Sequence, residues 1–314
     1  MKFLIGDAAM LSYLVKRIGN SILVLWVVMT VTFFLMHAIP GGPFTEEKSL
    51  PPAVMANIEA RYKLNDPLIT QYQDYLINVL QGDLGPSFKY VGRSVNDIIL
   101  ESFPVSLELG LEAILLALFI GVPAGVYAAY RRNGWQDRTV SLLTTLGVAV
   151  PSFVLAALLV DFFAMKLSLL PAALWNSWAS RVLPAIALAA MPMAFITRLT
   201  RSSMLDVLGQ DYIRTARAKG VPEKKVISKH AFRNTLIPLV TTLGGSLPSL
   251  FSGALITETL FSIRGIGYAS YNSMVQGDIP FVMFYLTFIS IMTLLGNLIS
   301  DLLYAVVDPR VRLG

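Results

Sequence analysis

DYIRTARAKGVP, residues 211–222, is the stretch around which the chain is organised. It lies inside a strongly basic interruption between two long apolar segments, so we expect it to face water on one side of a membrane. Asp211 can cap the start of a helix, and Gly220 stands where a left-handed residue commonly ends one. Arg217 and Lys219 fall in the last turn, where cations suit the helix dipole.

The residues that follow predict a second short helix. Pro222 is expected in its first turn, with Glu223 beside it. The two helices would meet at a Gly-Val-Pro elbow inside residues 206–235. A compact, protruding pair of short helices is a shape that another protein can bind.

The composition is that of a polytopic membrane protein. The chain has 314 residues, of which 55% are hydrophobic and only 14% charged, and its mean hydropathy is +0.63. The net charge of +5 comes from basic residues placed between apolar segments rather than from a separate basic domain, which argues against nucleic-acid binding. The absence of cysteine excludes disulfides and thiolate chemistry.

Charge-free runs predict six membrane-spanning helices, since a helix needs about 20 apolar residues to cross a bilayer. The expected spans lie at about residues 18–39, 105–130, 140–165, 182–197, 236–257 and 279–305. The first is too long for a cleaved signal and lacks a small-residue cleavage site, so we expect an uncleaved anchor. The predicted fold class is therefore an all-α polytopic membrane bundle.

The distribution of basic residues predicts the orientation of the chain. Six spans place both termini on one side of the membrane. Lys and Arg are concentrated in the segments on that side and are sparser in the others. Because cytoplasmic loops carry an excess of Lys and Arg, we expect the termini and the elbow in the cytoplasm.

The expected division of the chain has three parts. They are the cytoplasmic N-terminus and first span (1–39), an extracytoplasmic loop domain (40–103) and a five-helix core with the elbow at 206–235 (104–314). The loop is too long for a plain connector and carries helical signals at 52–63 and 66–80, a turn cluster at 82–87 and a helix start at 94–97. Two roles fit this loop: a small cap that covers the outer face of the bundle, or a docking surface or gate for a molecule that arrives from outside.

Several carboxylates lie in or near the expected spans. Glu108 and Glu112, four residues apart, share one helix face, where their like charges need water or a partner between them. We expect them to face the bundle interior or the outer interface. Asp161, Glu258 and Asp301 lie near span ends, where we expect hydrated interfacial carboxylates rather than parts of a transport path.

Helix-breaking residues interrupt the fourth and fifth expected spans. They are Pro184, Pro192, Pro238, Gly244, Gly245, Pro248 and Gly253. Close helix packing and a hinged pathway both fit this pattern, so the substrate pathway stays without assigned residues.

The sequence carries no pattern of an enzyme's active site. No Gly is followed directly by Lys, so a GxxxxGK[ST] phosphate loop is absent. His37 and His230 lie far apart with no HExxH arrangement, and no nucleophile elbow occurs. We therefore expect a protein that is not an enzyme and has no metal or cofactor site of its own.

Two motifs around the elbow point to a family. RTARAKG at 214–220 stands where bacterial ATP-binding-cassette (ABC) permeases have EAAxxxG, and LIP at 236–238 is similar to the closing IxLP of that signature. The chain resembles, within these permeases, the B-type subunits of the oligopeptide and dipeptide importers. Arg-Thr in place of Glu-Ala, and a longer distance from Gly220 to the closing motif, are habits of that peptide branch.

Further matches run through nearly the whole chain. They are LNDPL at 64–68 with Gln71-Tyr72, GDLG at 82–85 with Ser87, Glu258-Thr259 leading into FSIRGIG at 261–267, Asn297-Leu298, DLLY at 301–304 and DPR at 308–310. Arg264 stands where the family has proline. The order of the motifs and their topology together carry the resemblance.

The resemblance implies a type I ABC importer permease fold with six spans, in the bacterial cytoplasmic membrane. The elbow would be the coupling helix that seats in an ATPase subunit, formed by Asp211, Tyr212, Ile213, Arg214, Thr215, Ala216, Arg217, Ala218, Lys219 and Gly220. Tyr212 and Ile213 would offer an apolar anchor, and the small side chains of Ala216 and Ala218 would allow close approach.

The implied partners are a related second permease subunit, two ATPase subunits, an extracytoplasmic peptide-binding protein, the peptide and the lipid bilayer, with no nucleic acid. ATP would be bound by the ATPase subunits, and this chain would hold no cofactor. The cargo could be peptides or another solute of related systems, such as nickel chelates. An ion-coupled carrier or channel acting without ATPases is the alternative, with Glu108 and Glu112 as its weak candidates for a charge relay.

Overall fold

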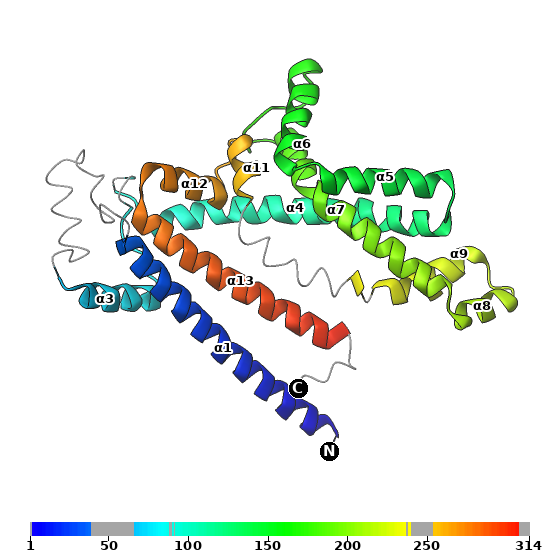
Figure 1. Cartoon of the computed structure of the whole chain (residues 1–314), viewed down its shortest axis with the longest axis horizontal. Helices are drawn as coiled ribbons and strands as arrows, with labels where there is room; N and C mark the ends of the chain where they lie inside the picture. The colour runs from blue at the N-terminus through cyan, green and yellow to red at the C-terminus, as the bar shows by residue number, and fades with distance from the viewer. Residues whose placement is uncertain are drawn as a thin grey trace.

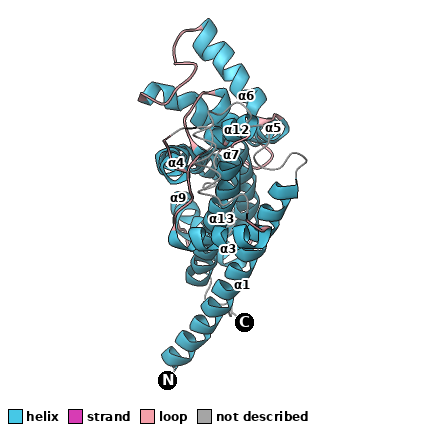
Figure 2. Cartoon of the chain, turned by 90° about the vertical axis from the view of Figure 1, so that its left-hand side faces the viewer, coloured by secondary structure: helices cyan, strands magenta, loops and turns pink. Residues whose placement is uncertain are grey.

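The computed structural model describes residues 2–38, 66–87, 90, 92–236, 238–239 and 254–307. Its regular elements are all helices, as Figure 2 shows, and the strand-like pairing found in these ranges is one antiparallel bridge between Pro86 and Ser94. The helices are α1 (Lys2–Ala38), α3 (Leu68–Gln81), α4 (Val95–Tyr130), α5 (Trp135–Ala149), α6 (Ser152–Leu159), the π-helix η2 (Val160–Lys166), α7 (Trp178–Leu208), α8 (Asp211–Ala218), α9 (Glu223–Lys225), the π-helix η3 (Val226–Ala231), α11 (Leu255–Leu260), α12 (Ile266–Gln276) and α13 (Ile279–Val307). The expected all-α class is confirmed.

Four described helices are long and apolar enough to cross a membrane: α1, α4, α7 and α13. The count rises to five if α5 and the α6–η2 segment are taken as one broken span. The expected fifth span, 236–257, lies mostly outside the described residues, so the prediction of six stays a prediction.

The third expected span is not one straight helix, which corrects the sequence prediction. Its two halves, α5 and α6–η2, are bent by 105° at the break before Ser152. The cause is Pro151, which has no backbone N–H and disfavours a helical conformation in the residue before it. Val150 accordingly adopts an extended conformation, with φ −86° and ψ 119°.

The centre of the fold is the pair of long helices α4 and α7, which run side by side (Figure 1). Their contact is made close by small residues. A Cβ atom on Gly125 would lie 2.6 Å from the carbonyl oxygen of Thr197, and one on Gly121 would lie 3.0 Å from that of Met193. Such close backbone approach is the role expected of small residues between membrane helices.

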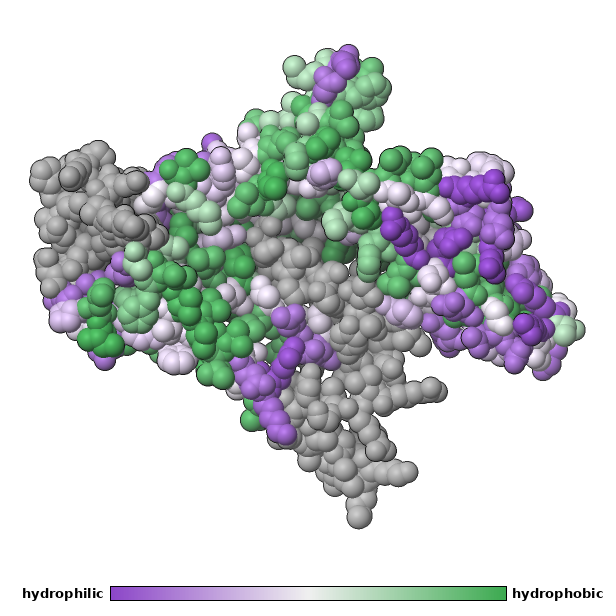
Figure 3. All heavy atoms as spheres, in the orientation of Figure 1, coloured by the Kyte–Doolittle hydropathy of each residue, from purple (hydrophilic) through white to green (hydrophobic). Residues whose placement is uncertain are grey.

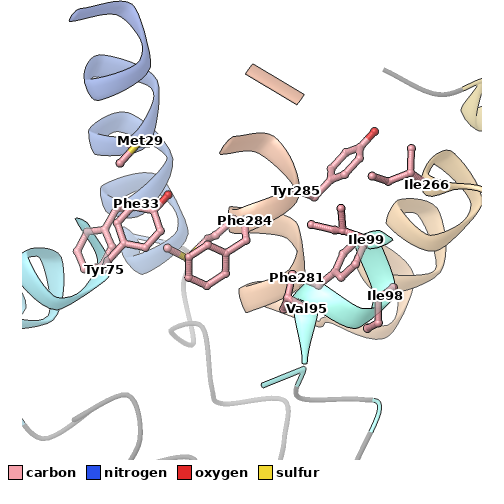
Figure 4. Close-up of a cluster of buried hydrophobic side chains, with 11 residues drawn as sticks. Met29, Phe33, Tyr75, Val95, Ile98, Ile99, Ile266, Phe281, Phe284 and Tyr285 are labelled. Atoms are coloured by element: carbon pink, nitrogen blue, oxygen red, sulfur yellow. The ribbon is translucent and has the colours of Figure 1, made fainter. Parts of the chain in front are cut away.

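Aromatic side chains join α1, α3 and α13. Figure 4 shows Phe33 of α1 and Tyr75 of α3 facing one another beside Phe284 of α13. The buried hydroxyl of Tyr75 is hydrogen-bonded to Thr287 at 2.8 Å, and Tyr72 reaches Thr30 at 2.6 Å. The helix predicted at 66–80 is therefore confirmed as α3, which packs against the end of α1.

Local signals set the start of α4. Ser94 accepts a hydrogen bond from the backbone N–H of Asp97 at 3.1 Å, and the Asp97 carboxylate accepts one from the N–H of Ser94 at 3.0 Å. This reciprocal capping confirms the predicted helix start. The helical signals at 52–63 lie outside the described residues.

The surface of the helices is widely apolar, as the green areas of Figure 3 show. Large exposed hydrophobic residues include Phe119, Leu115, Leu143 and Leu35. A soluble monomer rarely exposes so much contiguous apolar surface, whereas hydrocarbon covers it without cost.

Candidate functional site

The elbow expected in the sequence is present and consists of α8, a turn at Gly220 and the continuous α9–η3 segment. It projects beyond the end of α7, at the same end of the molecule as the turn between α4 and α5 (Figure 1). The first arm follows α7 after a break at Gly209 and Gln210, and the second arm continues into the helical residues 232–236. A displacement of the elbow therefore acts on two segments of the bundle.

The end of α8 follows from the position of Gly220. This residue has φ +74°, in the left-handed region that glycine occupies without cost. Its N–H donates to the carbonyl of Arg217 at 2.9 Å, and the N–H of Val221 donates to that of Ala216 at 3.2 Å. These two bonds form a Schellman motif, and the predicted role of Gly220 as the helix-ending residue is confirmed.

An ion pair fastens the two arms of the elbow to each other. Arg217 donates from Nη2 to Oε1 of Glu223 at 2.7 Å and from Nε to Oε2 at 3.1 Å. These hydrogen bonds lower the pKa of the Glu223 carboxyl below its usual value and raise that of Arg217. The charge of Arg217 is thus engaged inside the elbow, so less of it is presented to a partner than the sequence suggested.

The start of the elbow differs from the sequence prediction. Asp211 does not cap α8, because Gln210 holds the position before the first helical residue and Asp211 is itself the first residue. The Asp211 carboxylate still favours the positive end of the helix and lies 3.4 Å from Arg214. The second helix begins at Glu223, one residue after Pro222.

Ile213 is buried against the chain's own core, with none of its surface exposed. It packs in a cluster with Ala129, Met204, Val226 and Ala231, where the ends of α4 and α7 meet η3. The resemblance implied that Ile213 anchors a partner, but its side chain packs inward and leaves no surface for one. Ile213 couples the elbow to the bundle instead.

Tyr212 keeps an accessible position, with 41% of its surface exposed. Its hydroxyl accepts a hydrogen bond from the amide of Asn234 at 2.6 Å. Asn234 lies in the helical turn that leads out of the elbow. Tyr212 therefore links α8 to the segment entering the expected fifth span while leaving part of its ring free for a partner.

The outward face of the elbow is made of small and polar residues. Exposed are Asp211, Tyr212, Arg214, Thr215, Arg217, Ala218, Lys219 and Gly220, whereas Ala216 is half-buried. Among the described residues, Lys219 has no ion-pair partner, and Arg214 has only the long contact to Asp211. The face thus presents the positive charges of Arg214 and Lys219 beside the small, exposed side chain of Ala218. Such a surface is complementary to an acidic groove.

The expected carboxylate pair at Glu108 and Glu112 has a partner that sequence reasoning missed. Arg181 of α7 pairs with Glu108 and lies 3.0 Å from Oε1 of Glu112. Trp175 donates its indole N–H to Glu108 at 3.0 Å, and the Arg181 guanidinium stacks over the ring of Trp175. The separation of Glu108 and Arg181 in the sequence leaves no local signal for this cluster.

Glu258 corrects a second expectation, because it is fully buried rather than hydrated at an interface. Its Oε1 accepts hydrogen bonds from the hydroxyl of Ser106 at 2.7 Å and the N–H of Ala254 at 3.0 Å. Its Oε2 accepts one from the N–H of Tyr268 at 3.0 Å. Glu258 thus ties α4, α11 and α12 together at one point.

The remaining two carboxylates form ion pairs. Asp161 lies 2.7 Å from Lys166, and both side chains are exposed, as expected of an interfacial pair. Asp301 of α13 lies 2.7 Å from Arg17 of α1 and is mostly buried. The second pair joins α1 to α13.

Two family models match the chain. Residues 121–313 match the model described as "Binding-protein-dependent transport system inner membrane component". Residues 10–110 match the N-terminal model of the same kind of membrane component. The first match includes the whole elbow.

Curated relatives match over nearly their full length. The dipeptide transport system permease protein DppB of Bacillus subtilis is 46% identical over 304 residues, covering 97% of this chain and 99% of the relative. The oligopeptide transport system permease protein OppB of Escherichia coli K12 is 45% identical over 305 residues, covering 96% and 100%.

A solved structure supports the fold. The inward-facing methionine ABC transporter MetNI has a chain that superposes with a TM-score of 0.56 at 18% identity. The superposition covers 67% of this chain and 96% of that chain. At this identity the match concerns the fold alone.

Proposed function

The chain belongs to the family of binding-protein-dependent transport system inner membrane components, and from this premise we propose that it is a permease subunit that imports oligopeptides or dipeptides. The observation that carries the proposal is the identity of 45–46% to peptide permeases along nearly the whole chain. The energy comes from ATP that separate subunits bind, since the sequence has no phosphate-binding loop of its own.

The elbow is the part through which that energy enters. Closure of the ATPase subunits on ATP pushes the outward face of α8, from Tyr212 to Lys219. The Arg217–Glu223 ion pair and the Gly220 turn keep the two arms together, so the push moves the elbow as one piece. Ile213 passes the displacement to the ends of α4 and α7, and Tyr212 passes it to Asn234.

The assembly contains a related second permease, two ATPase subunits and an extracytoplasmic peptide-binding protein. Both termini and the elbow face the cytoplasm, as the excess of basic residues on that side supports. Alternating access then requires that ATP binding favours one of two packings of the bundle. The elbow transmits this preference from the ATPase subunits to the bundle.

An ion-coupled carrier is less well supported. Its weak candidates for a relay, Glu108 and Glu112, are both held by Arg181 in ion pairs that fix α4 to α7. These contacts give the two carboxylates a structural role, and the described part of the chain offers no further carboxylate beside them to continue a relay.

Reconstitution tests the proposal. Proteoliposomes holding the complete complex should take up labelled peptide only with the binding protein outside and ATP inside. Omission of the ATPase subunits should abolish uptake. Uptake by this chain alone under an ion gradient would contradict the proposal and favour the carrier.

A further inference from the structure

A polar groove of about 260 Å³ lies between α5 and α7 and has no lining residue from the elbow. The hydroxyl groups of Ser141, Thr144, Thr145 and Thr197 line it together with Arg198 and Arg201. In Figure 3, hydrophilic side chains gather at this end of the molecule, where α5 and α7 approach the elbow.

The groove carries an excess positive charge. Arg201 is bound by Asp137 through two hydrogen bonds, of 2.5 and 2.8 Å, and Asp137 is buried. Arg198 instead donates to the backbone carbonyl of Thr144 at 3.0 Å, and none of the described carboxylates lies within ion-pair distance of it. One guanidinium therefore faces the groove without a compensating anion from the described chain.

The groove adjoins an apolar cavity of about 240 Å³ that shares Val140, Thr144 and Thr197 with it. The rest of this cavity is lined by aliphatic side chains and small residues, among them Leu143 and Ala190. On α7, Ala190 lies eight residues before Arg198, which corresponds to about 12 Å along a helix. The polar groove and the apolar cavity thus form one site with two chemically different ends.

Aromatic residues place the polar end at the level of a membrane boundary. Tyr130 ends α4, Trp135 begins α5, and both are exposed. Tyr and Trp are enriched where membrane helices leave the hydrocarbon. Arg131 and Arg132 lie in the turn between them. Arg201, bound to Asp137 in the first turn of α5, lies at this level, and the apolar cavity extends toward the membrane interior.

We propose that this site binds an anionic phospholipid. The phosphate lies against Arg198 and the hydroxyl of Ser141, because the hydroxyls of Thr144, Thr145 and Thr197 donate to backbone carbonyls. The first part of an acyl chain occupies the apolar cavity. Arginine suits a phosphate because its planar guanidinium donates two parallel hydrogen bonds, and basic pockets between membrane helices bind anionic headgroups. A peptide fits less well, because aliphatic walls leave its amides without hydrogen-bond partners.

Native mass spectrometry of the complete transporter tests the site. The complex is equilibrated with equal amounts of phosphatidylglycerol and phosphatidylcholine, and the lipid that remains bound after detergent washing is counted. Wild-type complex should retain phosphatidylglycerol preferentially. Arg198→Gln should weaken that retention about tenfold, the effect of losing one charge-assisted hydrogen-bond pair. Arg138→Gln is the matched control, since this exposed arginine of α5 does not line the groove and should retain lipid normally.

A second variant tests the apolar end without changing charge. Ala190→Leu fills part of the apolar cavity, so it should also reduce phosphatidylglycerol retention while the complex still assembles. Equal retention of both lipids, or no effect of Arg198→Gln, would overturn the proposal. The proposal would also be overturned if inorganic phosphate displaced the phosphatidylglycerol and Ala190→Leu retained as much of it as wild type, because the site would then bind a free anion.

The assembled transporter decides one further alternative. If the isolated chain retained phosphatidylglycerol and the complete complex did not, the partner permease would cover the groove, and the lipid site would be rejected. Retention is measured without transport, so failure of this inference and failure of the import proposal are distinguishable.

Discussion

Arg217 and Glu223 form an ion pair with two hydrogen bonds across the elbow. Nη2 of Arg217 donates to Oε1 of Glu223 at 2.7 Å, and Nε donates to Oε2 at 3.1 Å. The pair joins the last turn of α8 to the first residue of α9. It bridges the turn that Gly220 makes possible, so the angle between the two arms depends on a charge as well as on the backbone.

The ion pair makes the elbow sensitive to acid. Because Arg217 lowers the pKa of Glu223, the pair contributes fully above the ordinary carboxyl pKa and is lost as pH falls through the lowered value. Both side chains are about two-fifths exposed, so screening limits the contribution to about 0.5 kcal/mol. Glu223→Gln should therefore weaken ATPase binding about twofold at neutral pH and remove this part of the acid dependence.

The measurement is the affinity of purified ATPase subunits for the permease pair in nanodiscs, at neutral pH and after acidification. Asp161→Asn is the control, because this carboxylate also belongs to an exposed ion pair but lies outside the elbow. An identical pH profile in wild type and Glu223→Gln would show that the pair does not shape the docking surface.

Gly220→Val should uncouple ATP hydrolysis from uptake. A Cβ atom at Gly220 would meet nothing within 4 Å, so the cost is one of backbone conformation rather than of a clash. A β-branched residue at φ +74° costs about 1–2 kcal/mol, enough to shift the end of α8. Peptide uptake per ATP hydrolysed, measured in proteoliposomes, should fall in this variant. The same ratio should fall less in Gly220→Asn, because Asn tolerates the left-handed backbone conformation.

Glu258→Gln should lower the thermal stability of the purified chain. An amide has one accepting oxygen, so it cannot serve the Ser106 hydroxyl and Ala254 N–H on one side and the Tyr268 N–H on the other. One or more buried donors are left unpaired, at about 1–3 kcal/mol. Thermal unfolding followed by intrinsic fluorescence measures the loss. Asp161→Asn, in an exposed pair, should change the midpoint little, and equal midpoints for both variants would argue against the buried node.

Arg181→Met should destabilise the chain by about 1–2 kcal/mol, because Glu108 and Glu112 are then left to repel each other on one helix face. Adding Glu108→Gln and Glu112→Gln to that variant should recover most of the loss. The variant with only Glu108→Gln and Glu112→Gln completes a cycle with these two variants and wild type, and the four unfolding midpoints isolate the charge interaction. A triple variant no more stable than Arg181→Met would mean that Arg181 acts through its stacking on Trp175 instead.

Local signals in the sequence predicted the local features well. The apolar runs of α1, α4, α7 and α13, the capping of α4 by Ser94 and the turn at Gly220 each depend on residues close in the chain.

Features that depend on distant residues were missed or predicted wrongly. The apolar face of α8 could have met a partner or the chain itself, and only the packing against Met204 and Ala129 decides that Ile213 is inside. Glu258 was expected at an interface because it lies near the end of the fifth expected span, yet its partner Ser106 lies on another helix. Pro151 was the available signal for the break after α5, and the apolar run around it concealed the break.

The tight contact at Gly125 has a mechanical consequence. A side chain there would collide with the Thr197 carbonyl, so the backbones of α4 and α7 are in close contact at this point, and we expect the two helices to move together. Bending is then easiest at the break between α5 and α6, because Pro151 lacks the N–H that would carry the helical hydrogen bonds across it. A displacement of the elbow is then expected to tilt α4 and α7 together and to change the angle between α5 and the α6–η2 segment.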